Sequence, residues 1–385
     1  MIPLSVPNIS GNEWKYVKEC LDTEWVSSAG KYVDIFEQKI SQYTGSKYVI
    51  ACTNGTSALQ VSLRLAGVKP GDEVIVPTLT FIAPVNSIAY NGANPVFMDT
   101  DKYFNLDIEK TIEFIQSETL FKNGTTYNKT TNARISAIIP VHMWGNAVWL
   151  DELVLLCRER NIVIVEDASE SLGSFYCKGN FKGKHTGTVG ELGCLSFNGN
   201  KIITTGGGGA ILTDNKKMAE KARYLTTQAK DDSVNYIHNE IGYNFRLTNI
   251  QAALGVAQME NLKDFLEHKS FIFNEYQKAF DNIEGLNIAN TPSYSRNNNW
   301  MILLQIKKKE YGEGRREIMD RLTLENIQTR PVWAPIHHQK PYINCQSYNI
   351  ESVDYMVENS LCLPSSTNLS KADLGTVIKA LGNSK

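Results

Sequence analysis

Short, continuous apolar runs alternate with amphipathic segments through the first half of the chain. The runs are typical of strands that are buried on both faces, and the segments between them have the periodicity of helices. Strands joined by helical crossovers predict a mostly parallel sheet in an α/β fold. The predicted strands are 48–52, 73–76, 95–98, 135–141 and 162–165, and the predicted helices are 55–65, 80–90, a segment after 107 and 151–160.

Two helices are predicted before the first strand. In the first of them, Trp14, Val17, Cys20 and Leu21 fall on one face. Residues 121–133 are rich in Asn, Thr and Lys and are predicted to form a solvated loop inserted before a strand.

The C-terminal part of the sequence predicts a second, smaller domain. Thr248 can cap a long helix that runs toward Phe280 and could connect two domains. Residues 300–306 are strand-like and residues 313–325 predict a helix. Together these elements are enough for a small C-terminal α/β domain.

The composition is that of an ordinary globular protein. At 385 residues the chain is long enough for one large domain, placed at 1–255 with the N-terminal segment, and a small domain at 256–385. With 39 basic and 41 acidic side chains the net charge is −2, so nothing indicates a nucleic-acid partner. The seven cysteines form no Cys-x-x-Cys pair, and no apolar stretch is long enough for a membrane span. We therefore expect a cytoplasmic protein without membrane or nucleic-acid partners.

One lysine stands between two predicted strands and beside a run of glycines. Lys201 follows the apolar segment 192–197 and precedes the segment 209–214. The glycines at 206–209 permit positive φ and a close approach of the backbone to a ligand. A lysine held in this way can lose its charge by desolvation and act as an amine nucleophile toward an aldehyde. The alternative is a surface lysine on a flexible hairpin.

The stretch Cys52–Ala58 follows a strand and opens a helix. Backbone N–H groups at this helix start, including that of Gly55, would form an anion site with the hydroxyls of Thr56 and Ser57. One interpretation of this stretch is a phosphate-binding site. Ser and Thr at a helix start are also common as plain caps, which is the alternative.

Carboxylates stand at the carboxyl end of a buried strand, where ligands of open α/β sheets bind. The sequence there is Glu166, Asp167, Ala168, Ser169, Glu170. An aspartate at this place could hold a ring nitrogen protonated, or it could be an ordinary cap at the end of the strand.

Phe81 could stack on a flat ring or belong to the core. His337 and His338 have no carboxylate or cysteine at ligand spacing, so we predict no metal site. The glycine run lacks the spacing of a dinucleotide-binding turn, and there is no P-loop. Taken jointly, an anion site, a strand-end aspartate, an aromatic ring and a glycine-flanked lysine are the contacts that pyridoxal phosphate requires.

These residues resemble the DegT/DnrJ/EryC1/StrS sugar aminotransferases, which have the fold type I, or aspartate aminotransferase, architecture. The resemblance covers nearly the whole chain. It rests on the motifs Asn54–Ala58, Pro77–Phe81, Pro140–His142, Glu166–Ala168, Ser196–Lys201, Gly242–Arg246, Arg330–Pro331 and Pro335–His337.

The resemblance implies a role for each member of the site. It makes Lys201 the Schiff-base lysine, places Asp167 on the pyridine nitrogen and stacks Phe81 on the ring. It implies phosphate contacts from Thr56, Ser57 and Ser196, and from Asn244 of a second subunit, and hence a homodimer with shared active sites. Family members that dehydrate sugars have histidine in place of the lysine, so the retained lysine favours transamination. Glu170 stands where the family often has glutamine near the phenolic oxygen of the cofactor.

More narrowly, the segments 2–8, 25–33 and 166–173 resemble the branch that makes legionaminic and related di-N-acetylated sugars. The resemblance implies transfer of the amino group of L-glutamate, through the pyridoxamine form, to C4 of a UDP-linked 4-keto-6-deoxy-N-acetylhexosamine. The candidate substrate contacts are Ser27, Lys31, Arg330 and His337. The alternatives are C3 amination of a dTDP-ketosugar, or a non-catalytic protein that senses the cofactor or a sugar nucleotide.

Overall fold

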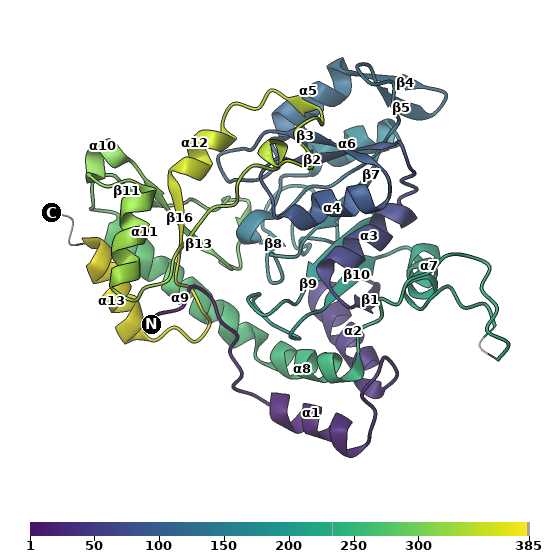
Figure 1. Cartoon of the computed structure of the whole chain (residues 1–385), viewed down its shortest axis with the longest axis horizontal. Helices are drawn as coiled ribbons and strands as arrows, with labels where there is room; N and C mark the ends of the chain where they lie inside the picture. The colour runs from purple at the N-terminus through teal and green to yellow at the C-terminus, as the bar shows by residue number, and fades with distance from the viewer. Residues whose placement is uncertain (233, 383–385) are drawn as a thin grey trace.

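The apolar runs form one large sheet in the computed structural model of the chain, which describes residues 1–232 and 234–382 (Figure 1). Within these residues the sheet has eight strands, and β10 runs in the direction opposite to the other seven. This confirms the predicted mostly parallel α/β sheet. In spatial order its strands are β1 (Tyr48–Cys52), β10 (Gly209–Thr213), β9 (Leu192–Ser196), β7 (Val163–Asp167), β6 (Ile135–Ile138), β2 (Glu73–Pro77), β3 (Asn94–Met98) and β15 (Ser347–Tyr348).

Amphipathic helices connect these strands and cover the sheet. Helix α3 packs against α4 and α7, all three pack against the strands, and α2 packs on β1. The apolar sides of these helices and the strands form a continuous core. The helices are α2 (Lys31–Thr44), α3 (Gly55–Leu65), α4 (Ile82–Tyr90), α5 (Ile108–Ser117), α6 (Asp151–Glu159) and α7 (Lys216–Thr226).

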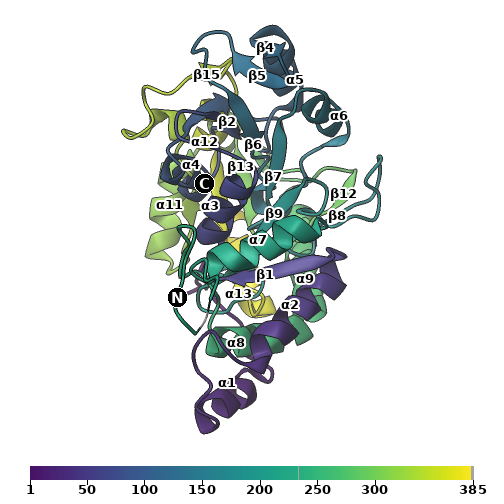
Figure 2. The ribbon, with the colours of Figure 1, turned by 90° about the vertical axis from the view of Figure 1, so that its right-hand side faces the viewer.

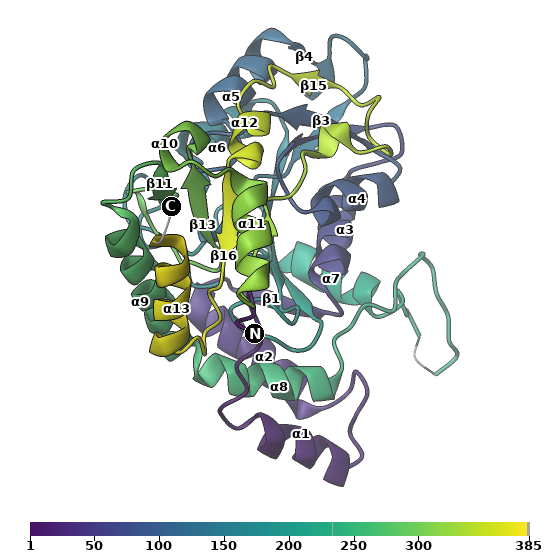
Figure 3. The same cartoon turned by 60° about the vertical axis from the view of Figure 1, so that its left-hand side comes forward.

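A second, antiparallel sheet has its own core near the C-terminal end of the chain. Its strand order is β11, β13, β16, β14, and α9, α11 and α13 pack around it (Figure 3). The elements are α9 (Leu262–Phe280), β11 (Leu286–Ile288), β13 (Ile302–Ile306), α10 (Lys308–Tyr311), α11 (Arg315–Leu324), β14 (Arg330–Pro331), β16 (Ser360–Leu363) and α13 (Lys371–Gly382).

The chain crosses between the two sheets more than once. Ile2 pairs with Ile327 beside the small sheet, whereas β15, from the C-terminal part, pairs with β3 of the large sheet. The remaining elements are α1 (Glu13–Asp22), the 3₁₀ turns Met143–Gly145 and Ile336–His338, β8 (Phe175–Tyr176), β12 (Ser295–Arg296) and α12 (Val353–Glu358).

The predicted single helix from Thr248 to Phe280 is two helices. Thr248 caps α8 (Asn249–Glu260) with a capping box that includes Gln251, as expected from its position. Asn261, at φ −99° and ψ 0°, then leaves the helical conformation before α9 begins. The break has a physical reason, because α8 packs on α1 and α2 whereas α9 packs in the core of the small sheet.

The predicted loop at 121–133 is wrong, because most of it is a hairpin. Strand β4 (Thr119–Lys122) pairs antiparallel with β5 (Thr125–Asn128). Asn123 (φ 52°) and Gly124 (φ 74°) form the turn, and Asn-Gly is the residue pair that two-residue hairpin turns prefer. Figures 1 and 2 place this hairpin at one end of the molecule and α1 at the opposite end.

The face of α1 that carries Trp14, Val17, Cys20 and Leu21 is buried only in part. Cys20 is buried, but Trp14 is 77% exposed and Leu21 is 53% exposed. In this helix Glu13 is buried instead, and its carboxylate accepts hydrogen bonds from Gly11 N–H and the Gln258 amide. Among the described residues, every helix is too short or too polar to span a bilayer.

Candidate active site

A cavity of about 380 Å³ opens at the carboxyl edge of the large sheet. The loops after β1, β2, β7 and β9 line it, which is where open α/β sheets bind ligands. This cavity is called the cleft below. It brings together seven of the predicted site residues, namely Gly55, Thr56, Phe81, Asp167, Glu170, Ser196 and Lys201.

Lys201 is held inside the cleft and is not a surface lysine on a hairpin. Its side chain is 13% exposed, and its Nζ lies 3.6 Å from Glu170 Oε1. The same Nζ lies 3.8 Å from the centre of the Trp300 ring. Burial lowers the pKa of this amine, while Glu170 and Asp167 act in the opposite direction. A lysine with a lowered pKa is a better nucleophile near neutral pH.

The start of α3 forms one end of the cleft. Asn54 caps the helix, and its Oδ1 accepts the Ser57 N–H at 2.7 Å. Gly55 is packed so closely that a Cβ on it would lie 2.9 Å from Ser196 Cβ. The positive end of the helix dipole and the hydroxyls of Thr56 and Ser196 therefore face the same space, as a bound phosphate requires.

Asp167 is the last residue of β7 and lines the cleft. The residue is 4% exposed, and one carboxylate oxygen accepts the Ser169 N–H at 3.0 Å. Burial raises the pKa of this carboxyl. A buried carboxylate is stabilised when a cationic group binds it, and a protonated ring nitrogen is such a group.

A buried pair lies directly behind Asp167. His142 Nδ1 accepts the Val148 N–H at 3.0 Å, so its Nε2 carries the proton that it donates to Glu166 Oε2 at 2.8 Å. Burial would raise the pKa of Glu166, but His142 and the backbone N–H groups of 187 and 190 lower it below its usual value. The backbone N–H of His142 donates to the Asp167 carbonyl at 3.0 Å. The pair thereby fixes the end of β7.

Glu170 is buried beside Lys201. Its Oε2 accepts the Trp144 N–H at 2.9 Å, and burial raises the pKa of its carboxyl to about 7 despite Lys201. Trp144 adopts a left-handed conformation with φ 51°, which turns this N–H toward the carboxylate. The carboxyl therefore changes charge close to neutral pH.

Aromatic side chains form the other wall. Phe81 is 52% exposed, so it is not a core residue, and its ring lies 5.8 Å from that of Trp333. Trp300 and Trp333 line the cleft as well, and sequence reasoning missed both as site residues. The only signals were an Asn-Asn-Asn run before Trp300 and two prolines around Trp333.

The other predicted residues lie outside the cleft lining. Ser57 is buried, and its hydroxyl is 3.3 Å from that of Thr53. Asn244, Ser27, Lys31 and Arg330 are exposed. Lys31 pairs with Glu19, and Asn244 lies on the long connection between α7 and α8, which projects from the body of the molecule (Figures 1 and 3).

His337 is half-buried next to the end of β2, where its Nδ1 lies 2.5 Å from Thr78 Oγ1. The sequence has no carboxylate at ligand spacing from the histidine pair, but the fold brings one to it from another element. His338 Nε2 lies 3.0 Å from Asp354 Oδ1, and the three side chains gather within 4.8 Å. The chain spacing hid this contact, because Asp354 comes from α12.

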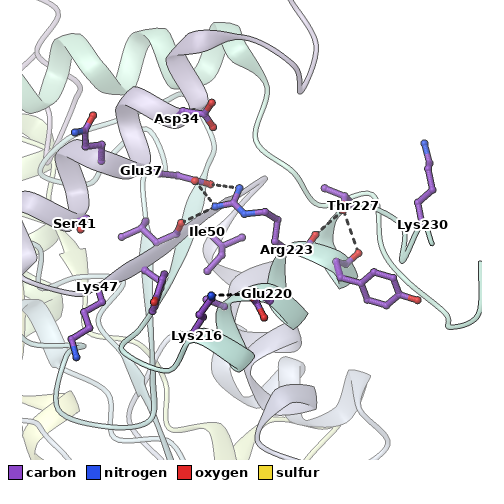
Figure 4. A pocket seen from close by; sticks show the side chains of 15 residues that line it. Asp34, Glu37, Ser41, Lys47, Ile50, Lys216, Glu220, Arg223, Thr227 and Lys230 are labelled. Atoms are coloured by element: carbon purple, nitrogen blue, oxygen red, sulfur yellow. Dashed lines mark hydrogen bonds and ion pairs between the residues drawn. The ribbon is translucent and has the colours of Figure 1, made fainter. Parts of the chain in front are cut away.

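A second cavity, of about 650 Å³, lies between α2, β1 and α7 (Figure 4). The Arg223 guanidinium crosses it and binds Glu37 at 2.6 Å, while Lys216 pairs with Glu220. None of the predicted site residues lines this cavity, and two of its ion pairs, Arg223 with Glu37 and Lys216 with Glu220, are made within its own lining.

Comparisons with known proteins agree with this geometry. The model of the DegT/DnrJ/EryC1/StrS aminotransferase family matches residues 7–382. The chain is 36% identical to Bacillus subtilis EpsN, whose name describes a pyridoxal phosphate-dependent aminotransferase, over 99% of this chain and 95% of that protein. It is also 36% identical to the GDP-perosamine synthase of Caulobacter vibrioides, over 99% and 97%. A crystal structure of a DegT/DnrJ/EryC1/StrS aminotransferase from Brucella abortus superposes with a TM-score of 0.86 and 27% identity, covering 96% of this chain and 94% of that one.

Proposed function

The chain belongs to the DegT/DnrJ/EryC1/StrS aminotransferase family, and from this premise we propose which sugar it aminates and which residues do so. It is a pyridoxal phosphate-dependent transaminase of nucleotide-sugar pathways. The proposed reaction moves the amino group of L-glutamate to C4 of a UDP-linked 4-keto-6-deoxy-N-acetylhexosamine. The observation that carries the assignment of residues is the convergence of Lys201, Asp167 and the start of α3 on one cleft.

The residues of the cleft fit the cofactor. Its phosphate would lie against the N-terminus of α3, with hydroxyls from Thr56 and Ser196. The close packing around Gly55 leaves no room for a side chain at that position, so the phosphate would meet the backbone there. Phe81 would pack on the face of the ring. When bound, pyridoxal phosphate supplies an electron sink for the carbon that loses its proton.

The protein supplies the charges and the proton transfer. Asp167 would hold the ring nitrogen protonated, because a buried carboxylate and a buried cation stabilise each other. Lys201 Nζ would bind the aldehyde covalently and, once released, would take the proton from the α-carbon of glutamate. Its lowered pKa gives a larger fraction of neutral amine for both tasks. Glu170 and Trp300 hold that amine in place.

The nucleotide of the sugar is proposed from the N-terminal part of the chain. The resemblance of the segments 2–8 and 25–33 favours UDP, and the N-terminal segment does reach the cleft, since Ser5 Oγ donates to the Asn200 carbonyl at 3.2 Å. A second candidate is a GDP-linked ketosugar, favoured by the name of the Caulobacter relative.

An acceptor panel distinguishes these candidates. Purified protein with pyridoxal phosphate and L-glutamate is offered the UDP-, GDP- and dTDP-linked 4-keto-6-deoxy sugars and a dTDP-linked 3-ketosugar. The proposal predicts the largest kcat/KM with the UDP sugar and nitrogen on C4 by NMR of the product. A higher kcat/KM with a GDP sugar would replace UDP by GDP, and nitrogen on C3 would refute the assigned carbon. Protein that is loaded with cofactor but aminates none of them would favour a sensor.

We also propose a cytoplasmic homodimer that shares its active sites. The projecting connection, which the structure describes at 227–232 and 234–248, exposes Val234, Tyr236, Ile237 and Ile241, the kind of apolar surface that a second copy would cover. Asn244, on the same connection, would then reach the phosphate of the neighbouring subunit. Sedimentation equilibrium should give twice the chain mass, and a monomer at micromolar concentration would refute the proposal.

A further inference from the structure

The small domain contains a buried lysine for which no acidic partner is found among the described residues. Lys269 lies in the middle of α9 and is 1% exposed. Burial alone lowers the pKa of its amine to about 7. Burying such a group is costly, and it is tolerated only where its hydrogen bonds are satisfied. The acceptors of its hydrogen bonds therefore indicate the role of Lys269.

The partners of Lys269 are two backbone carbonyls and one hydroxyl. Its Nζ donates to the Trp300 carbonyl at 2.7 Å, to the Ser365 carbonyl, and to Ser365 Oγ at 3.3 Å. An ammonium group has three N–H donors, so these three acceptors match it in full. The ammonium thus joins the loop before β13 to the loop after β16.

Both of these loops are connected by hydrogen bonds to Asn200, the residue before Lys201. Trp300 Nε1 donates to the Asn200 carbonyl at 2.6 Å. Ser365 N–H donates to the Leu4 carbonyl at 2.8 Å, and the next residue of that segment, Ser5, donates to the same Asn200 carbonyl. Two chains of contacts that start at Lys269 therefore end on one carbonyl.

The Trp300 ring makes a further contact, directly to the reactive group. Its centre lies 3.8 Å from Lys201 Nζ, and the residue is 2% exposed, so the ring has little freedom to move. A shift of the Trp300 backbone would displace both the ring and the Asn200 carbonyl. Either displacement moves the amine relative to the cofactor and the substrate.

We propose that Lys269 is a positioning residue for the transamination, which sets the place of Lys201 by holding Trp300 and the N-terminal segment. The inference rests on the proposed role of Lys201 as the reactive amine. It assigns to the small domain a part in the chemistry of the large one, although Lys269 is not in the cleft lining.

The test compares Lys269→Met with Lys278→Met. Methionine keeps much of the apolar stem and removes the donors. Lys278 is on the same helix but is exposed and pairs with Glu275 at 3.1 Å, so the matched change there should leave kcat unaltered. For Lys269→Met we expect kcat to fall about ten- to hundredfold while KM for glutamate and for the sugar nucleotide changes less than about threefold, because small displacements of a reacting group cost that much.

Two further measurements separate positioning from a general loss of stability. Trp300→Phe removes the indole donor, and if both residues act through one chain, the fall in kcat of Lys269→Met/Trp300→Phe will be much smaller than the product of the single effects. The visible band of the loaded protein should also titrate with a displaced midpoint in both single variants, and with the wild-type midpoint in Lys278→Met.

A folded, loaded Lys269→Met protein with wild-type kcat and an undisplaced midpoint would overturn the proposal, as would multiplying effects in the double variant. If Lys269→Met does not fold, Ser365→Ala and Trp300→Phe carry the same test, and multiplying effects between them would overturn it. Failure of the underlying function is distinguishable, because Lys201→Ala would then retain multiple turnovers whatever Lys269→Met does.

Discussion

Two buried carboxyls of the cleft are assigned different tasks by their surroundings. Asp167 is expected to stay ionised opposite a cationic ring nitrogen, so Asp167→Asn should lower kcat about a hundredfold or more, since an amide cannot balance that charge. Steady-state kinetics at saturating cofactor measure the loss. Asp264→Asn, at an exposed position in the first turn of α9, is the control and should be unaffected. An Asp167→Asn enzyme within threefold of the wild type would remove Asp167 from the mechanism.

The Glu170 carboxyl should make the free energy of unfolding depend on pH. Its carboxyl has a pKa of about 7 in the folded protein against 4.5 for the free group, so between these pH values the folded state keeps a proton that the unfolded state releases. Stability therefore falls as the pH rises from 4.5 to 7, by up to roughly 3 kcal/mol from this group. Urea unfolding of the cofactor-free protein at both ends of this range should show the fall in the wild type and a flatter profile in Glu170→Gln. Equal slopes would contradict the raised pKa.

At the residue scale, local sequence predicted the groups that carry charge but not the surfaces that hold them. Lys201 and Asp167 follow from their places beside a glycine run and at the end of a strand. Trp300 could not be found in this way, because it contacts Lys201 only after two distant loops are brought together. The contact between His338 and Asp354 escaped for the same reason.

At the scale of elements, the hairpin turn offers a clean test of conformational strain. Gly124 has φ 74°, and a Cβ on it would lie at an ordinary van der Waals distance of 3.7 Å from Asn161 Nδ2, so Gly124→Ala should lower the free energy of unfolding by about 1 kcal/mol through backbone strain rather than through a clash. Gly375, inside α13, is the control, because a Cβ there would meet nothing within 4 Å and its φ is not positive. There the same substitution should be stabilising by about 0.5–1 kcal/mol, because alanine favours helix. Denaturant unfolding of both variants measures the difference, and a stabilised Gly124→Ala would show that the turn is not as described.

The strands and most helices followed from periodicity because burial on both faces or on one face leaves a direct record in the sequence. The hairpin was missed because a polar composition was given more weight than its Asn-Gly pair, which fixes a turn. The break at Asn261 was missed because no residue near it in the sequence requires one. It lies where the chain passes from α8, which packs on α1 and α2, to α9, which packs in the core of the small sheet.

At the scale of the whole molecule, shared sites predict that two inactive variants can complement each other. Lys201→Ala lacks the reactive amine and Asn244→Ala lacks the contact that would reach the neighbouring subunit. A mixed dimer has one intact site, so co-expression should restore up to about a quarter of the wild-type activity. Mixing two samples that carry the same variant is the control and should restore none. Absence of any recovery in verified mixed dimers would mean that each site is built from one chain.

The general architecture could be predicted at this scale, but the course of the chain between its two sheets could not. The pairing of β15 with β3, and of Ile2 with Ile327, depends on contacts between segments that are hundreds of residues apart in sequence. Such pairings leave no periodic pattern. They matter for function because one of them carries the N-terminal segment to the carbonyl of Asn200.

The most direct test of the account is to locate the covalent attachment of the cofactor. The intact, loaded protein is reduced with borohydride, digested and analysed by mass spectrometry for a pyridoxyl group on lysine. The account predicts the group on Lys201 alone, in a peptide that is unmodified in Lys201→Ala. A pyridoxyl group on any other lysine, the buried Lys269 included, or no modified lysine in protein that shows the cofactor's visible band, would contradict it.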